Sequence, residues 1–307
     1  MNRRQFTKAA GSGVLAAAVP GYGAEAEQII DIHQHINFHG RRNGELLEHQ
    51  KAMGVTKTVL LPAGSILSRG STNGGKANGL AARVFGTEAA ARLTAEHPES
   101  FVYFCNEIPD IDGATASMEK WLEKGALGIG ESKFKLECDS APMIGIYEVA
   151  KAYDVPVLLH FQHNAYNMGF DRFYKVLEKF PTVAFIGHAQ TMWGNIDAAH
   201  DQTAMYPAGP VKPGGLTDKY LSDYPNMYGD LSAGSGKNAI NRDEEHAAAF
   251  FERHQDKLML GTDCADMVGS GEKCSGSGQI ENVRKLVSDP VARAKIFSGN
   301  AKRVVGI

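Results

Sequence analysis

The chain has 307 residues, of which 43% are hydrophobic and 22% are charged, and its formal net charge is −3. This length can bury a large core, and it permits either one α/β barrel or two smaller domains. The small net charge gives no long-range attraction for nucleic acid, and no basic tract with interleaved aromatic residues occurs. Nucleic-acid binding is therefore not expected.

Residues 1–26 have the features of an export signal rather than of a folded domain. Two adjacent arginines, Arg3 and Arg4, precede an apolar run over residues 9–19 and an Ala-Glu-Ala cleavage sequence. The run is too short and too rich in glycine and alanine for a membrane span, so we expect no stable membrane anchor. We predict a twin-arginine-type signal over 1–26, export to the periplasm or the outside of the cell, and one domain over 27–307. An amphipathic N-terminal helix is the alternative.

Beyond the signal, apolar runs alternate with amphipathic ones. Strands are predicted over residues 27–33, 55–62, 101–105, 126–134, 155–161, 183–189, 227–231 and 257–262. Helices are predicted over residues 45–53, 80–97, 114–124, 143–153, 170–180, 242–254, 279–287 and 291–297. Two polar segments, 65–79 and 190–225, are predicted as loops, and the second is expected to cover the site as a lid or rim.

Eight strands, each followed by a helix or by a loop and a helix, indicate parallel pairing and the α/β class. Eight such units in a domain of this length predict a (β/α)₈ barrel, the TIM-type fold. A doubly wound open sheet is the alternative, but no Gly-x-Gly-x-x-Gly sequence follows an early strand. In a barrel, we expect the chemistry at the carboxyl ends of the strands.

Metal-ligand residues stand at several of these strand ends. His33 and His35 close the first strand, and alternate residues of a strand point to the same side, so both imidazoles face one way. Such a pair is a weak signal by itself. Three further residues that can bind metal follow later apolar strands and predict one shared metal site: His160, His188 and Asp263.

The order His33-x-His35, His160, His188 and Asp263 on strands one, five, six and eight resembles the amidohydrolase superfamily. The closing Ser-Gly-Asn-Ala-Lys-Arg sequence resembles the amidohydrolase-related branch, which contains hydrolases and decarboxylases such as aminocarboxymuconate-semialdehyde decarboxylase. The resemblance implies that His33, His35, His160 and Asp263 bind metal. It makes His188 either a ligand of a second metal or a catalytic acid or base.

The fourth strand bears on whether one or two metals are bound. By the same resemblance, a carboxylated lysine or a glutamate at its end bridges two metals. Glu131 and Lys133 share a face there, and Glu131 is favoured because it is already anionic. An ion pair at the barrel rim is the alternative. The donor set favours one or two Zn²⁺ ions, although Mn²⁺, Fe²⁺ and Co²⁺ share these ligands.

These residues predict a metal-dependent hydrolase of a small-molecule amide, ester or lactone, in which metal-activated water attacks and Asp263 accepts its proton. A non-oxidative decarboxylase is the first alternative. It needs a cation near the leaving carboxylate, and no arginine ends a strand. An exported, non-catalytic metal-binding protein is the second alternative. A homo-oligomer is compatible with the sequence.

Further residues are assigned more weakly. His163, Arg69 and Arg41 are expected near the substrate, and Asp230 is expected to hydrogen-bond the metal ligands. The four cysteines are interpreted as free, mostly buried thiols, with a Cys264–Cys274 bridge as the alternative. The remaining helix and loop histidines are predicted at the surface: His49, His97, His200, His246 and His254.

Overall fold

The computed structural model describes residues 27–63, 79–80 and 84–307. The predicted signal, Arg69 and nearly all of the predicted loop 65–79 lie outside these ranges, so export stays a prediction. Each predicted strand overlaps an observed one. The strands are β1 (Ile29–Gln34), β2 (Val55–Leu60), β3 (Phe101–Tyr103), β4 (Ile129–Ser132), β5 (Val157–His160), β6 (Phe185–His188), β7 (Met227–Asp230) and β8 (Leu258–Met259).

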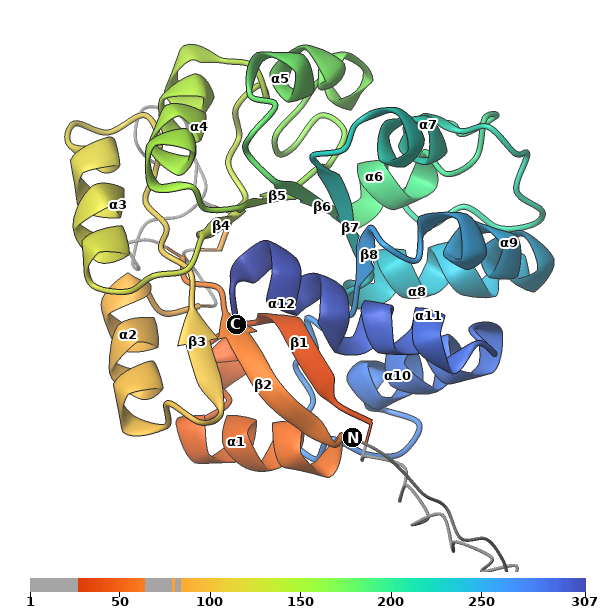
Figure 1. The fold of residues 1–307 in the computed structure, drawn as a ribbon, viewed down its shortest axis with the longest axis horizontal. Coiled ribbons are helices and arrows are strands. Elements are labelled where there is room, and N and C mark those ends of the chain that lie inside the picture. The colour runs from red at the N-terminus through yellow and green to blue at the C-terminus, as the bar shows by residue number, and fades with distance from the viewer. Residues whose placement is uncertain (1–26, 64–78, 81–83) are drawn as a thin grey trace, which may run out of the picture.

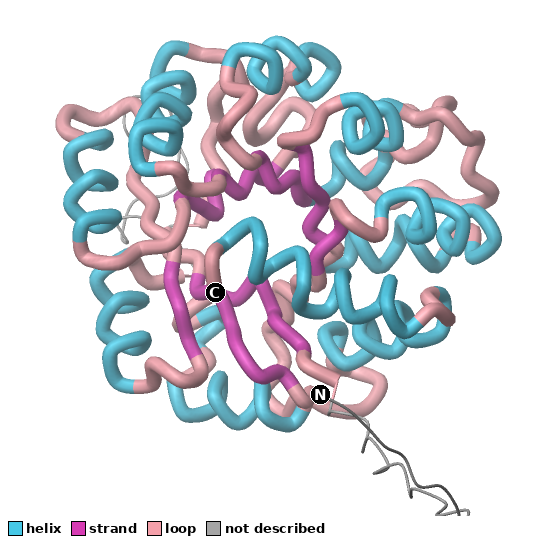
Figure 2. The backbone as a smooth tube through the Cα atoms, viewed as in Figure 1, coloured by secondary structure: helices cyan, strands magenta, loops and turns pink. Residues whose placement is uncertain are grey.

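The strands form a parallel ring with helices outside it (Figures 1 and 2). Strands β1 to β3 and strands β4 to β8 pair in sequence order. A parallel bridge between Cys105 and Ile129 joins β3 to β4, and Ile32 donates its N–H to the carbonyl of Leu260 beyond β8 at 3.0 Å. These contacts connect the two sheets, and the predicted (β/α)₈ barrel is confirmed.

Most helices follow the strands around the outside of the ring (Figure 1). Their apolar faces pack on the outward side chains of the strands in one large core. The helices are η1 (Phe38–Gly40), α1 (Asn43–Ala52), α2 (Thr87–Glu96), α3 (Ala114–Glu123), α4 (Ala141–Tyr153), η2 (Phe170–Arg172), α5 (Tyr174–Lys179), α6 (Ala189–Gly194), α7 (Leu216–Asp223), α8 (Ala233–Asn241), α9 (Glu244–His254), α10 (Ser275–Leu286), α11 (Pro290–Ala294), η3 (Lys295–Gly299) and α12 (Asn300–Val305). No helix in the described part of the chain is both long and apolar enough to cross a bilayer.

A second apolar cluster fills the inside of the ring. It contains strand residues together with Ala301 and Val305 of α12, which crosses the centre of the ring in Figure 1. Helix α12 therefore packs on the barrel interior, and the ligand residues at the carboxyl ends of the strands form the other end. The members of this interior cluster in the strands or directly after them are Ile30, Ile32, Val59, Leu61, Phe104, Leu158, Ile186, Tyr228 and Met259.

Truncating an interior side chain is expected to destabilise the whole domain. Leu158 is fully buried in the interior cluster, so Leu158→Ala should lower the free energy of unfolding by about 2–5 kcal/mol. The measurement is equilibrium unfolding in urea. Val291→Ala is the control, because Val291 is 63% exposed and its truncation should change stability by less than about 0.5 kcal/mol. A small loss for Leu158→Ala would contradict this packing.

The segment 190–225 is not one long loop as predicted. Helix α6 occupies its start and α7 lies near its end. The Thr217 hydroxyl donates to the Met192 carbonyl at 2.5 Å, and Tyr220 and Leu221 are buried, so contacts distant in sequence stabilise these short helices. The stretch between the two helices, residues 195–215, is irregular.

Other helix boundaries also differ from the prediction. Helix α2 begins at Thr87 rather than at residue 80, because the preceding residues are not helical and Phe85 donates its N–H to the Ile36 carbonyl. Helix α8 was missed because its sequence is rich in glycine and other small residues. Helix α12 was missed because it continues directly from the π-helical η3.

Candidate metal centre

Two histidines at the end of β1 form the middle of the site. His33 and His35 point to one side, as predicted, and their Nε2 atoms lie 3.3 Å apart. Gln34 turns away and donates from Nε2 to the Thr262 hydroxyl at 2.7 Å. Both imidazoles are buried. The alternation of side chains along the strand therefore brings two ring nitrogens to one point.

The opposite nitrogens of these rings are held by hydrogen-bond acceptors, which fixes the tautomers. His35 Nδ1 donates to the Leu61 carbonyl at 2.7 Å, and His33 Nδ1 donates to Asp230 Oδ2 at 2.6 Å. In the neutral rings, both Nε2 atoms then carry lone pairs that face each other. Two lone pairs cannot hydrogen-bond, so this arrangement favours a cation between them.

Two carboxylates extend this group of acceptors. Glu131 Oε2 lies 3.5 Å from His33 Nε2 and 3.3 Å from His35 Nε2. Asp263 Oδ1 lies 3.9 Å and 3.3 Å from the same two nitrogens. This buried oxygen has no hydrogen-bond partner among the described residues. Imidazole nitrogens and carboxylate oxygens are ordinary ligands of Zn²⁺ and similar ions, so these residues fit a divalent cation.

The pKa shifts of these groups also indicate that a positive charge is stabilised at this site. Burial opposes protonation of His33 and His35, but the nearby carboxylates outweigh it and raise the pKa of both imidazoles. Burial by itself would raise the pKa of the Glu131 and Asp263 carboxyls, yet the neighbouring histidines hold both pKa values below the ordinary range. A metal ion supplies such positive charge and displaces the protons of its ligands.

Glu131 faces a second pair of histidines through its other oxygen. His160 Nδ1 lies 2.7 Å from Glu131 Oε1, and His188 Nε2 lies 3.7 Å from the same oxygen. The two rings are in contact, with centroids 5.2 Å apart. Glu131 thus lies between both pairs, where a bridging carboxylate would be needed. Lys133 instead places Nζ 5.6 Å from the centroid of the Tyr166 ring.

Burial keeps this second pair of imidazoles neutral. Burial, together with the Lys133 charge, lowers the pKa of His160. Burial, together with repulsion from a protonated His33, lowers the pKa of His188 to about 3. Neutral imidazole is the form that binds metals. His188 forms a possible metal-binding group with His33 and Glu131. His160 belongs to no such group among the described residues, because its two ring nitrogens lie at Glu131 Oε1 and Gln162 Oε1.

Two residues that support the centre were not predicted. Asp31 Oδ1 accepts the N–H groups of His33 at 3.0 Å and Thr262 at 2.9 Å, which ties the end of β1 to the segment after β8. Ser232 Oγ lies 2.9 Å from Asp230 Oδ2 and 2.8 Å from His188 Nδ1. Asp31 precedes the two histidines by two and four residues, a signal that the sequence contained. Ser232 carried no signal of its own.

A family model described as Amidohydrolase matches residues 30–307, a range that includes all these residues. The chain belongs to the amidohydrolase family. The resemblance of the ordered histidines and aspartate is thereby confirmed at the level of the family. No curated protein sequence matches this amidohydrolase.

Solved structures similar to this amidohydrolase share its barrel. A 5-carboxyvanillate decarboxylase from Sphingomonas paucimobilis is 13% identical, with a TM-score of 0.56 over 92% of this chain and 100% of that one. A probable 2-pyrone-4,6-dicarboxylic acid hydrolase from Acinetobacter baumannii is 11% identical, with a TM-score of 0.59 over 91% and 100%. An uncharacterised TIM-barrel protein from Bordetella bronchiseptica is 16% identical, with a TM-score of 0.61 over 91% and 98%. At these identities the likeness shows the fold.

Of the more weakly assigned residues, Asp230 contacts His33 as predicted, whereas His163 and Arg41 lie away from the centre of the amidohydrolase site. His163 is exposed and lines a pocket of about 460 Å³, together with Gln162, whose Oε1 lies 3.1 Å from His160 Nε2. Arg41 was expected at the substrate, but it is buried and donates to the carbonyl of Cys264 at 2.9 Å. Its charge therefore supports the segment after β8. Arg69 lies outside the described residues.

Three of the histidines predicted at the surface are buried, so that prediction was wrong for them. His254 Nε2 lies 2.5 Å from Asp218 Oδ1, and His246 stacks on Phe250. His49 is fully buried beside two cysteines. Whether a helix residue is buried depends on which face of its helix packs against the barrel. The position of a single histidine in the sequence does not show which face it lies on.

Asp230→Asn is expected to weaken metal binding about 10- to 100-fold, because the carboxylate that orients His33 Nδ1 loses its charge. The measurement is metal affinity by competition with a chelator. Ser232→Ala is the comparison. It removes a neutral hydroxyl that contacts both the same carboxylate and His188 Nδ1, and it should have a smaller effect. Unchanged affinity in Asp230→Asn would contradict the role of this contact.

Proposed function

We propose that this amidohydrolase hydrolyses an amide, ester or lactone bond of a small molecule at the site formed by the four strand-end histidines, Glu131 and Asp263. The observation that carries the proposal is the Asp263 carboxylate. Its Oδ1 atom lies beside His33 and His35 and accepts no hydrogen bond from the described residues. Its side chain is 19% exposed, whereas those of the two histidines are at most 1% exposed.

A divalent cation held by His33, His35 and Asp263, and by Glu131 if it bridges to His160 and His188, would lower the pKa of a coordinated water and polarise a substrate carbonyl. Asp263 is ionised at neutral pH, since its pKa lies below the ordinary range. It lies at the partly exposed edge of the centre, where water and substrate arrive. The Asp263 carboxylate is therefore placed to accept a proton from the attacking water and to pass it to the leaving group.

The tautomer of His188 limits what this residue can do. The Ser232 hydroxyl lies between the Asp230 carboxylate, which only accepts, and His188 Nδ1. The hydroxyl therefore donates to Asp230 and accepts from His188 Nδ1–H. His188 Nε2 is left with a lone pair on the Glu131 side, which suits a metal ligand or a base rather than an acid.

Lys133 favours a second candidate function, decarboxylation. Its positive charge helps to lower the pKa of His160, and its Nζ lies 5.6 Å from the centroid of the Tyr166 ring. A lysine in this position is suited to hold a substrate carboxylate. The Sphingomonas neighbour is a decarboxylase, so this candidate requires a direct test.

An isotope experiment separates the two reactions. The full chain, loaded with metal, is incubated with amides, esters, lactones and aromatic carboxylates in water enriched in oxygen-18 and deuterium. Hydrolysis adds one solvent oxygen to the product and releases no carbon dioxide. Decarboxylation releases carbon dioxide and places solvent deuterium on the carbon that lost it. No turnover by fully loaded protein on any class would favour the non-catalytic alternative.

A further inference from the structure

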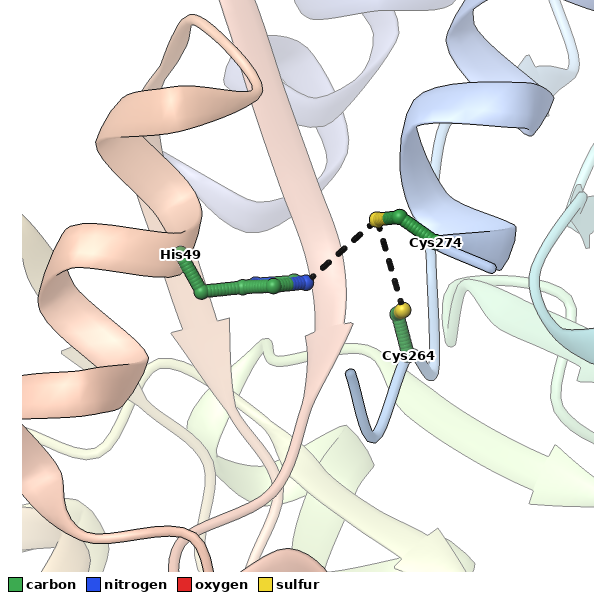
Figure 3. Close-up of side chains that lie close together, drawn as sticks. All are labelled: His49, Cys264 and Cys274. Carbon is green, nitrogen blue, oxygen red and sulfur yellow. Dashed lines mark hydrogen bonds between the residues drawn. The ribbon is translucent and has the colours of Figure 1, made fainter. Parts of the chain in front are cut away.

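A group of sulfur and nitrogen donors lies apart from the proposed reaction site, where α1, the segment after β8 and the start of α10 meet (Figure 3). It consists of His49, Cys264 and Cys274, here called the cysteine cluster. Each of the three residues is at most 1% exposed, and their ligand atoms lie within 4.8 Å of one another. The proposed hydrolysis uses none of these side chains.

The spacing of the cysteine cluster fits a bound ion. Cys264 Sγ lies 3.8 Å from Cys274 Sγ, and Cys274 Sγ lies 3.6 Å from His49 Nε2. A tetrahedral ion with ordinary Zn–S and Zn–N bonds separates two sulfurs by about 3.8 Å and a sulfur from a nitrogen by about 3.6 Å. A disulfide would instead hold the sulfurs at about 2 Å.

Neighbouring groups add a further sulfur ligand and a hydrogen-bond donor to the cysteine cluster. Met53 Sδ lies 3.8 Å from Cys274 Sγ, so a thioether is available as a fourth ligand. The N–H of Ser277 donates to Cys274 Sγ at 3.3 Å, a contact that stabilises an anionic sulfur. Thiolate, imidazole and thioether donors select Zn²⁺ or Cu⁺ over hard cations, and a thioether favours Cu⁺.

We propose that His49, Cys264 and Cys274 bind one thiophilic metal ion, Zn²⁺ or Cu⁺, in a closed structural site next to Met53. Cys264 directly follows Asp263 in the chain, and its carbonyl accepts hydrogen bonds from Arg41 at 2.9 Å and Gln34 at 3.2 Å. The bound ion would join this segment to α1 and to α10. It would thereby hold the segment that positions Asp263.

Metal analysis of the purified full chain tests this proposal independently of the reaction. Zinc and copper are quantified separately in the wild type and in three variants. Cys274→Ser should hold one metal equivalent less than the wild type, either of zinc or of copper. Cys138→Ser is a matched change at another buried thiol and should hold as much metal as the wild type. Asp263→Asn should retain the ion of the cysteine cluster even if the reaction site loses its own.

A Cd²⁺ titration of the wild type supplies a readout that needs no variant. Cd²⁺ bound to thiolates absorbs in the ultraviolet, whereas Cd²⁺ bound only by imidazoles and carboxylates does not show that band. The band should saturate at one equivalent, persist in Cys138→Ser and be lost in Cys274→Ser. Absence of the band in reduced wild-type protein would overturn the proposal. A mass two hydrogens below that of the reduced chain, which shows a native disulfide, would also overturn it.

Discussion

Asp263→Asn is expected to reduce turnover by about 100- to 10,000-fold, because the amide cannot accept the proton of the attacking water. The change keeps the size of the side chain and one oxygen near His33 and His35. The loss should therefore fall mainly on kcat rather than on KM. Steady-state kinetics on a substrate found in the isotope experiment measure both values, and metal analysis reports whether the ion is still bound.

The control for this variant lies three residues further along the chain. Asp266 accepts the N–H groups of Val268 at 2.9 Å and Gly269 at 2.7 Å in a turn. Asp266→Asn should keep kcat within a few-fold of the wild-type value. If Asp263→Asn retained wild-type kcat with metal bound, another group would have to accept the proton.

Glu131→Gln is expected to remove one metal equivalent from the reaction site. Glu131 faces the His33–His35 pair through Oε2 and the His160–His188 pair through Oε1. Glutamine offers one oxygen, and its amide NH₂ repels a cation, so it cannot bridge two ions. The count is best made in a Cys274→Ser background, which removes the contribution of the cysteine cluster.

Two outcomes of this measurement have distinct meanings. A fall from two equivalents to one supports a binuclear centre with Glu131 as the bridge. One equivalent before and after the change would contradict the bridging role, and it would favour a mononuclear site and the decarboxylase candidate. Glu123→Gln is the control, since Glu123 is exposed on α3 and should not alter the metal content.

The barrel and the proposed ligands could be predicted because both depend on local patterns. In β5, Leu158 faces the interior cluster and His160 follows two residues later; in β6, Ile186 and His188 repeat this spacing. A period of two therefore carries each ligand residue to the inside of the ring. The parallel barrel then brings strand ends that are far apart in sequence to one rim.

The supporting contacts could not be predicted in the same way. Ser232 reaches His188 and Asp230 through the position of its hydroxyl, and neither its neighbours nor its spacing distinguishes it from other serines. His49 is buried because α1 packs its face against the segment after β8, a contact that joins residues 225 positions apart. Such pairings depend on the folded chain rather than on a local pattern.

The position of α12 also constrains how the chain can fold during synthesis. Ala301 and Val305 belong to the interior cluster that the strands line, yet the ribosome makes them after all the strands of the ring. A nascent chain that ends before α12 therefore leaves apolar interior side chains exposed to solvent. We expect stalled or truncated chains that lack α12 to be held by chaperones or degraded, because their ring cannot complete its core.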